Sequence, residues 1–444
     1  MTGRLTFFFS MRWWVAVAWI EDLIREGQKS VDEIEVFYVE GTSVSADLKQ
    51  KKVNLATTSR DCGLGIRIIH KGRIGSSSTN DPDKWRDCLK AAIASGKLAT
   101  PQTWNGLPEP VSILSSSLSF DPALECDPDI ARDLLRQMLE GASEHPADIT
   151  AGSASLSVSS VTLANSYGIR YEDHHTGVSL SLEAIERQST GSEFDYKSYI
   201  GDVNPRHVGE QAAFFASKST DGKEIPTGDY PVVLSPLAYA ELLGNVFIPA
   251  LNGRSVHSGR SRLAQSLGQT IADPRLQMYD DPLLPRASGS TGWDAEGTPA
   301  RRIDFIWDGV LQTFAYDLKT AYRYDKKTTG SAVRGGFGGL PAIGHHNFIV
   351  DGKRDNILDE RVLYVHNVVG AHTANPMSGD YSVEISNAFW MEDGGFEEPV
   401  RSAMMSGNVF DLHKDIAGLS KETRAIGSLI LPSIKINKQR IIGK

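Results

Sequence analysis

The sequence predicts an α+β protein, with an N-terminal α+β domain of helices and antiparallel strands followed by a β-rich C-terminal domain. Two observations carry this prediction. The first half mixes segments of helical periodicity with segments in which apolar residues alternate, as amphipathic helices and half-buried strands do. The second half repeats Asp-Gly pairs between strand-like runs, at 308–309, 351–352 and 393–394. Because both turn positions tolerate positive φ, Asp-Gly is a strong signal for a hairpin.

The length of the chain indicates more than one domain. A chain of 444 residues exceeds what one hydrophobic core usually serves. The polar segment 219–228 (STDGKEIPTG) gathers turn-forming residues and interrupts the periodicity, as linkers do. We therefore place the domains at 1–220 and 221–444.

The N-terminal half opens with an apolar run, 7–20, that is similar to a signal peptide. Arg12 splits the run, and no small-x-small cleavage site follows it. The run continues into 21–25 (EDLIR), so we interpret it as an amphipathic first helix and expect a cytoplasmic protein. No other stretch approaches the roughly 20 apolar residues of a membrane span. The sequence leaves open whether Met1 or Met11 is the true start.

Strands and helices alternate in the rest of this half. The turn Lys71-Gly72 predicts a hairpin, and Asp81-Pro82 predicts a helix start, with Asp as cap and Pro in the first turn. The predicted elements are strands at 34–39, 65–70 and 73–74, helices from 81 and around 130–139, strands between 149 and 186 about a turn at 165–168, and a short helix at 209–218.

The second half contains one clear helix among predicted strands. Ser235 is placed to cap it, Pro236 falls in its first turn, and apolar residues at helical spacing follow up to Phe247. Asn252-Gly253 is expected to end it. The strongest hairpin signal is Asp308-Gly309, between the strand-like runs 303–307 and 310–316.

Charge and cysteine content exclude several classes of function. A net charge of −9 and the absence of a long Lys/Arg run argue against a nucleic-acid partner, since phosphate binding needs a basic face. The three cysteines are scattered, and no CxxC motif occurs among Cys62, Cys88 and Cys126. This pattern is typical of a reducing compartment. No cysteine follows Cys126, so the rest of the chain has no thiolate for a metal.

Motifs for nucleotide binding or nucleophilic catalysis are missing. Gly63-Leu-Gly65 lacks a third glycine and precedes a predicted strand, whereas a dinucleotide fingerprint needs a helix N-terminus. No GxSxG elbow occurs. The acid pairs Asp280-Asp281 and Glu397-Glu398 lie beside prolines, and we expect both on the solvated surface.

Histidine pairs and a glycine-rich loop are the remaining candidates for a site. Neighbouring residues of a strand point to opposite faces, so neither His174-His175 nor His345-His346 is expected to chelate one ion. The loop 334–339 (RGGFGG) is expected to line a groove or interface. The candidates for contact with a ligand are therefore Arg334, His345, His346 and Asn347.

Several fragments, spread over nearly the whole chain, carry a resemblance to a known family. They are a first strand at 32–38 (DEIEVFY), a hairpin over 62–75 with the pattern G-x-G-x-R … G-x-x-G, the turn 165–168 (NSYG), the motif 293–299 (WDAEGTP), and closing segments at 378–382, 387–394 and 406–408. In this order and spacing they resemble the TldD/PmbA metallopeptidase family, also known as peptidase U62 or "modulator of DNA gyrase". The resemblance implies the α+β fold above and metal-dependent peptidase action on extended peptides.

The resemblance also assigns the chain to one branch of this family. TldD-like members carry H-E-x-x-x-H on a helix and a late cysteine that completes a zinc site. On the matching positions this chain has Ser235, Pro236 and Ala240, and no cysteine near 427–428. This set has no imidazole for zinc and no carboxylate to polarise water, so it resembles the PmbA/TldE branch.

We therefore expect a non-catalytic subunit with no catalytic or metal-binding residue of its own. Its partner would be a TldD-like subunit that supplies zinc, and the pair would act on a peptide substrate held at a strand edge. Two alternatives stay open. The chain could be a stand-alone homodimer that binds peptides or scaffolds proteins without proteolysis, or a peptidase with a relocated metal site that includes His345 and His346.

Overall fold

The computed structural model describes residues 18–49, 52–113 and 117–444. The predicted N-terminal helix lies partly outside these residues, as do both candidate start methionines, but residues 18–27 are helical. No helix in the described part of the chain is long and apolar enough to cross a membrane.

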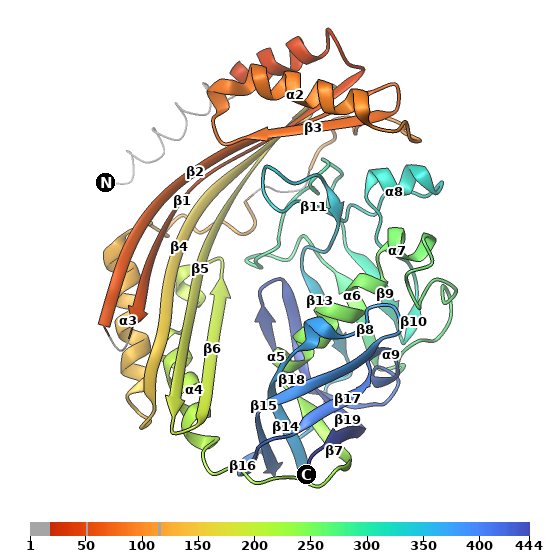
Figure 1. The fold of residues 1–444 in the computed structure, drawn as a ribbon. Helices are drawn as coiled ribbons and strands as arrows, with labels where there is room; N and C mark the ends of the chain where they lie inside the picture. The colour runs from red at the N-terminus through yellow and green to blue at the C-terminus, as the bar shows by residue number, and fades with distance from the viewer. Residues whose placement is uncertain (1–17, 50–51, 114–116) are drawn as a thin grey trace.

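The first sheet is antiparallel and has the strand order β3-β2-β1-β4-β5-β6 (Figure 1). Its strands are β1 (Glu33–Lys49), β2 (Lys52–His70), β3 (Arg73–Thr79), β4 (Asp148–Asn165), β5 (Arg170–Glu186) and β6 (Ser189–Lys197). Lys71 and Gly72 both have positive φ and form the predicted β2–β3 turn.

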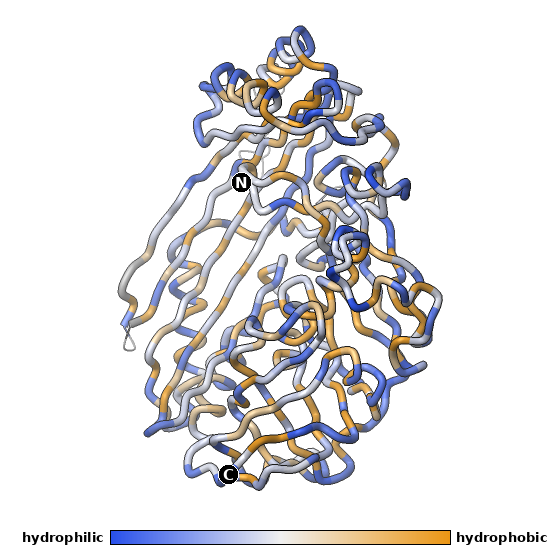
Figure 2. The backbone as a smooth tube through the Cα atoms, turned by 45° about the vertical axis from the view of Figure 1, so that its right-hand side comes forward, coloured by the Kyte–Doolittle hydropathy of each residue, from blue (hydrophilic) through white to orange (hydrophobic). Residues whose placement is uncertain are grey.

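Several of these strands are longer than predicted. β1 continues past residue 39 through Val44, Ala46 and Leu48, which are buried at every second position. Ser45 and Asp47 stand between them, and the polar residues of this stretch hid its period of two. Figure 2 shows apolar and polar residues alternating along these long strands.

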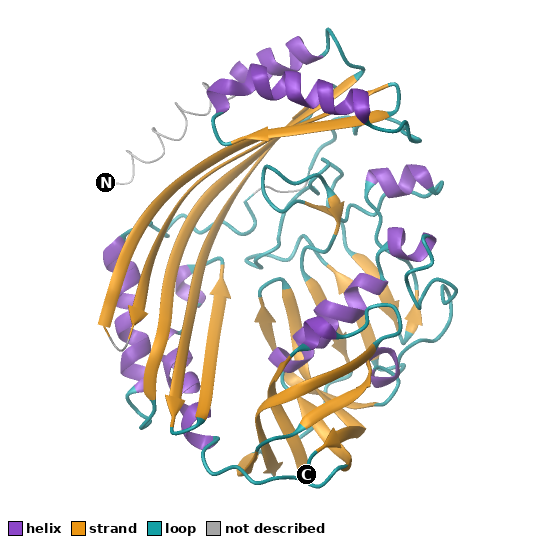
Figure 3. Cartoon of the chain, viewed as in Figure 1, coloured by secondary structure: helices purple, strands orange, loops and turns teal. Residues whose placement is uncertain are grey.

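Helices cover the outer side of this curved sheet (Figure 3). They are η1 (Pro82–Lys84), α2 (Trp85–Leu98), α3 (Pro128–Ala142), η2 (Ile200–Asp202) and α4 (Pro205–Lys218). Asp81 caps η1 as predicted, since its side chain accepts a hydrogen bond from the Asp83 N–H. The helix predicted at 209–218 starts earlier, because Asn204 caps it and Pro205 occupies its first turn.

The second sheet contains eleven strands, all from residues after 227, and it is mixed. They are β7 (Gly228–Leu234), β8 (Leu276–Asp280), β9 (Ile303–Trp307), β10 (Val310–Leu311), β13 (Phe348–Gly352), β14 (Val362–Val369), β15 (Asp380–Glu392), β16 (Gly395–Val400), β17 (Met404–Asn408), β18 (Ile416–Ile426) and β19 (Leu429–Ile442). β11 (Ala332–Val333) and β12 (Ala342–Ile343) pair separately. The segment 219–228, at which we propose the domain boundary, connects α4 to β7.

Two of the three predicted Asp-Gly turns are hairpin turns. Asp308-Gly309 joins β9 to β10 and Asp393-Gly394 joins β15 to β16, with positive φ at all four residues. The prediction for 351–352 was wrong, because both residues lie inside β13 and pair with β8. Gly352 is required there by a close approach, since a Cβ would lie 1.9 Å from the Arg275 carbonyl oxygen.

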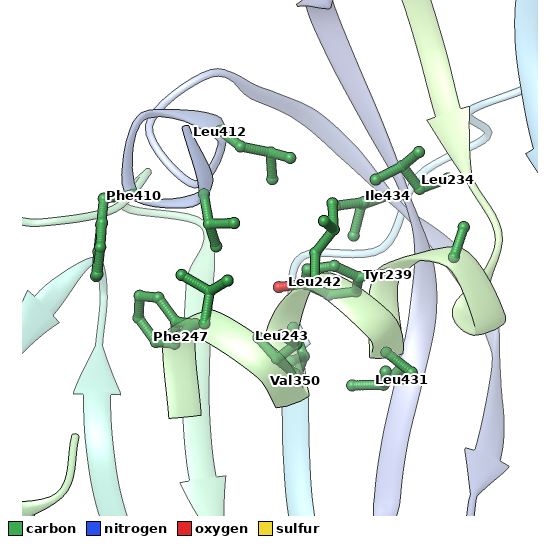
Figure 4. Packing of buried hydrophobic residues seen from close by; sticks show 14 of the residues in the cluster. Leu234, Tyr239, Leu242, Leu243, Phe247, Val350, Phe410, Leu412, Leu431 and Ile434 are labelled. Carbon is green, nitrogen blue, oxygen red and sulfur yellow. The ribbon is translucent and has the colours of Figure 1, made fainter. Parts of the chain in front are cut away.

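A short run of helical turns packs against this second sheet. It consists of α5 (Pro236–Leu242), the π-helical turn η3 (Leu243–Phe247) and α6 (Ile248–Ala250), and it is followed by α7 (Gly253–His257); α8 (Leu318–Arg323), η4 (Ala371–Thr373) and α9 (Val409–Leu412) complete the helices of the described residues. The run ends at Ala250, next to the predicted end at Asn252-Gly253, and Asn252 then begins α7 as its cap. Tyr239, Leu242 and Phe247 pack into the largest core, against residues of β7, β13 and β19 (Figure 4).

Candidate functional site between the two sheets

The start of α5 is the position that matches the zinc motif of TldD-like proteins. Ser235 caps the helix: its Oγ accepts hydrogen bonds from the N–H groups of Leu237 (3.1 Å) and Ala238 (3.2 Å) and donates one to the His366 carbonyl oxygen. Pro236 fills the first helical position, and the Ala240 methyl is buried in the core. Ser235 and Pro236 therefore form the start of a helix, and Ala240 packs in the hydrophobic core.

His366 lies beside this helix start, on β14, and faces the N-terminal half. Its ring stacks on Phe215 of α4 with 3.6 Å between centroids. Neither ring nitrogen has a hydrogen-bond partner among the described residues, and Nε2 lies 4.0 Å from a Glu193 carboxylate oxygen. Burial, together with a smaller effect of the nearby Arg424, lowers the pKa of His366 to about 3. The imidazole is therefore neutral at physiological pH.

A buried cluster of ion pairs joins the first sheet to the C-terminal half. Arg67 of β2 donates to Glu35 of β1 and to Glu296, each at 2.6 Å, and Arg334 donates to the other oxygen of Glu35. The four side chains are between 1% and 3% exposed. We call Glu35, Arg67, Glu296 and Arg334 the junction cluster.

The charges of the junction cluster perturb one another. Burial alone would raise the pKa of Glu35, but Arg67 and Arg334 together lower it. Burial is the main reason that the pKa of Glu296 is raised to about 7, and the nearby carboxylates of Asp294 and Asp317 raise it as well. Arg67 acts in the opposite direction and lowers this pKa. Glu296 therefore exchanges a proton near neutral pH, while Glu35 stays ionised.

A tight turn over residues 294–299 holds Glu296 in this position. Asp294 accepts hydrogen bonds from the N–H groups of Glu296 and Thr298, both at 2.9 Å, and from Ala332 at 3.2 Å. Gly297 has a φ of +85°, and a Cβ there would lie 2.7 Å from Ile169 of the N-terminal half. The D-x-E-G-T-P sequence thus encodes a turn that packs against the first sheet and aims a carboxylate at Arg67.

The glycine-rich loop contacts the first sheet directly. A Cβ on Gly63 would lie 2.1 Å from the Phe337 ring, and a Cβ on Gly65 would lie 2.1 Å from the Phe337 carbonyl oxygen. Only glycine leaves room for this loop on β2. The G-x-G pattern at 63–65 therefore makes room for Phe337 on β2.

Comparison with known proteins agrees with this architecture. Family models for the PmbA/TldA metallopeptidase match as domain 1 over residues 34–96, as the central domain over 121–220 and as the C-terminal domain over 227–443. MJ0231 of Methanocaldococcus jannaschii is 30% identical over 420 residues, which is 94% of this chain and 98% of that protein. The chain belongs to the TldD/PmbA family.

Its full-length relatives include members named PmbA and TldE. Metalloprotease PmbA of Escherichia coli O157:H7 is 28% identical over 92% of this chain and 93% of its own. The crystal structure of TldE from Thermococcus kodakarensis has a TM-score of 0.88 and 26% identity, over 96% of this chain and all of that one. A putative modulator of DNA gyrase from Thermotoga maritima shares the fold, with a TM-score of 0.84 at 23% identity, over 95% of this chain and 98% of its own.

The zinc of this metallopeptidase family does not fit the residues at the start of α5. Zinc in proteins is bound by imidazole, thiolate or carboxylate groups, and Ser235, Pro236 and Ala240 have none of these. The described residues also contain no group of three or more His, Cys, Asp or Glu side chains arranged to hold a metal. We derive no catalytic step through zinc in this TldD/PmbA chain.

The structure places the four groove candidates in two locations. Arg334 is buried in the junction cluster. The other three lie before β13: the His345 Nε2 is 3.1 Å from the Ser428 Oγ, His346 contacts Asp280, and the Asn347 amide bridges Asp281 and Ser290. His346 is buried, Asn347 is fully buried, and His345 is partly exposed.

Two sequence expectations about neighbouring groups have mixed outcomes. Asp280 and Asp281 were expected on the surface, but Asp280 is fully buried, with both carboxylate oxygens accepting the His346 N–H, and Asp281 is half-buried. Glu397 and Glu398 are exposed as predicted and pair with Arg361 and Lys223.

The sequence did not predict Glu35, Arg67 and Glu296 as site residues. All three lie in segments that resemble the family, at 32–38, 62–75 and 293–299. Arg67 and Glu296 are 229 positions apart, so no local pattern could pair them. The sequence does contain one signal: a charged residue lies inside an apolar strand at 35 and again at 67. A charge that is buried in such a strand needs a partner of opposite charge.

Proposed function

We propose that this chain is a non-catalytic PmbA/TldE-like subunit that helps to bind extended peptides for a TldD-like zinc metallopeptidase. One observation carries the proposal: the helix start where TldD-like members place their zinc motif is built here from a capping Ser235, Pro236 and a core Ala240. Such a helix start has no metal ligand and no general base, so hydrolysis takes place in the partner.

The full-length similarity to PmbA and TldE supports this role. It extends over more than nine-tenths of this chain and of each of those two proteins. Cys62, Cys88 and Cys126 are free, which supports the proposed cytoplasmic location.

For peptide contact we propose the region around His345. Its ring is partly exposed beside Ser428, which lies in the turn between β18 and β19. His346, Asn347 and Arg334 are held by internal hydrogen bonds, and their proposed role is to fix the walls of the groove. Main-chain hydrogen bonds to a strand edge would align an extended peptide without selecting its sequence.

Reconstitution tests the proposal. The chain is purified alone and together with a TldD-like subunit, and each sample is incubated with an unfolded peptide whose cleavage is followed by mass spectrometry. We expect cleavage in the mixed sample and none with this chain alone. The matched control is a partner whose H-E-x-x-x-H glutamate is replaced by glutamine, which should abolish cleavage in the mixture.

Two outcomes would reject the proposal. Cleavage by this chain alone would indicate a relocated metal site. A homodimer on gel filtration that binds the peptide, ignores the TldD-like subunit and adds nothing to cleavage would support the stand-alone peptide-binding alternative.

A further inference from the structure

The surface around α7 and α8 carries an excess of basic side chains in a chain whose net charge is −9. No Asp or Glu occurs from residue 242 to 272. The stretch 318–329 has four basic residues and a single acid, Asp325. We call the following six side chains the basic face: Arg254, Arg301, Lys319, Arg323, Lys326 and Lys327.

Contacts between the elements bring these residues together. The His257 ring, at the end of α7, stacks on Tyr324 just after α8, with 4.1 Å between centroids and an interplanar angle of 9°. The Gly253 N–H donates to the Ala315 carbonyl oxygen at 2.9 Å, and Arg301 donates to the Thr328 carbonyl oxygen at 3.0 Å. Figure 1 shows α7 and α8 next to each other on one side of the molecule.

The cations of the basic face lack acidic partners. Among the described residues, nearby basic side chains such as Arg302 and Arg262 form ion pairs with Asp304 and Asp411, but none of the six forms one. Asp317 and Glu296 point inward, because they accept the N–H groups of Thr320 and Leu318. The positive charge of this face is therefore not neutralised within the chain.

The spacing of the basic residues on α8 makes their positive charges repel one another in the isolated chain. Lys319 and Arg323 are one helical turn apart, and like charges at this spacing repel. Lys326 also helps to lower the pKa of His257, after the larger effect of burial, which reports the positive potential at this point. An anionic partner would remove the repulsion.

We propose that the basic face is a docking surface for a protein segment rich in Asp and Glu. Planar guanidinium groups such as Arg254, Arg301 and Arg323 bind carboxylates with two parallel hydrogen bonds. A long nucleic acid is disfavoured, because its phosphates would extend past the basic face and be repelled by the rest of a chain whose net charge is −9, whereas a short acidic segment can bind on the basic face alone. The same repulsion disfavours a second copy of this chain. The inference does not depend on the proposed peptidase role.

A binding experiment with defined probes tests this docking surface. Fluorescence anisotropy measures binding of a labelled decaglutamate peptide, a labelled ten-nucleotide oligothymidine and a neutral Gly/Ser decapeptide to the full chain at low salt. We expect decaglutamate to bind, the neutral peptide not to bind, and the complex to dissociate at about 0.5 M salt, where exposed charges are screened.

Charge reversal locates the site. The variant R323E/K326E/K327E should bind decaglutamate at least about tenfold more weakly, since the attraction becomes repulsion. The matched control K97E/K353E/K438E changes three exposed cations elsewhere, by the same net charge, and should stay within about threefold of the parent chain. If circular dichroism shows that the reversed variant does not fold, R323Q/K326Q/K327Q takes its place.

Three results would overturn the proposal. They are no decaglutamate binding by the parent chain, equal loss in the two triple variants, and tighter binding of oligothymidine than of decaglutamate. The second would indicate a general effect of net charge, and the third a nucleic-acid site.

Discussion

Single residues of the junction cluster carry the connection between the two halves. Arg67 is shared by two carboxylates that come from different halves, Glu35 on β1 and Glu296 on the 294–299 turn. Removing one partner from a buried ion pair leaves an uncompensated charge in a medium of low polarity. The buried ion pairs of Arg67 are therefore expected to matter more for the contact between the two halves than exposed ion pairs do.

Replacement of Arg67 by methionine tests this view. The variant R67M keeps much of the side-chain volume but leaves the buried Glu296 without a cation and Glu35 with Arg334 alone, so we expect a loss of about 3–5 kcal/mol in the free energy of unfolding. The control R206M removes an exposed ion pair with Glu144, and exposed pairs contribute about 0–1 kcal/mol. Urea unfolding measures both; equal losses would contradict the argument.

The protonation of Glu296 gives the junction cluster a pH dependence. Its folded pKa of about 7 lies above its ordinary value of 4.5. Between these values the folded chain binds a proton that the unfolded chain does not, so this contribution to stability is fully present below pH 4.5 and is lost as pH rises through 7. The difference corresponds to about 3 kcal/mol.

The matched variant is E296Q, which cannot titrate at this position. Urea unfolding of both chains from pH 5 to 8 gives the difference in their free energies of unfolding, in which other titrating groups largely cancel. We expect the original chain to lose stability relative to E296Q as pH rises. Parallel curves for the two chains would show that Glu296 does not titrate in this range.

At the scale of elements, local signals explain the ends of helices and the tight turns. Ser235 and Pro236 mark the start of α5, and Asp308-Gly309 marks the β9–β10 turn, because capping and positive φ depend on a few neighbouring residues. The Asp-Gly pair at 351–352 failed as a turn signal, since strand pairing with β8 determines its conformation. Non-local contacts also determine the junction cluster, where Glu35 meets a residue 299 positions away.

The cap of α5 gives an element-scale prediction. The variant S235A removes the acceptor for two N–H groups and the donor to the His366 carbonyl oxygen, so we expect a loss of about 1–2 kcal/mol in stability. S235N, which restores a capping side chain, should lose less. A thermal unfolding midpoint that is the same for S235A and the original chain would show that the cap is dispensable.

The close contact between Phe337 and β2 gives a second prediction at the scale of elements. The variant G63A places a methyl group where the Phe337 ring lies, and overpacking of this kind costs about 1–3 kcal/mol. In the background F337A the same substitution should cost little, because the ring is gone. A double-mutant cycle of unfolding free energies measures the coupling; purely additive effects would mean that the two residues do not meet.

For the whole molecule, two groups of polar contacts between the halves lie at separate places. The junction cluster is one of them. At the other, Arg424 of β18 pairs with Glu193 of β6, and the Asn387 amide donates to Thr190 and Ser219 at 2.8 Å each. The first sheet is thus fixed to the C-terminal half at more than one point, and we infer that the two halves move as one rigid body.

The central claim is that this subunit belongs to a zinc peptidase without binding zinc itself. The most direct measurement is zinc content by elemental mass spectrometry, after each purified sample is saturated with Zn²⁺ and gel-filtered. We predict no stoichiometric zinc in this chain alone and one zinc per complex once a TldD-like subunit is bound. A full equivalent of tightly held zinc in this chain alone would contradict the account.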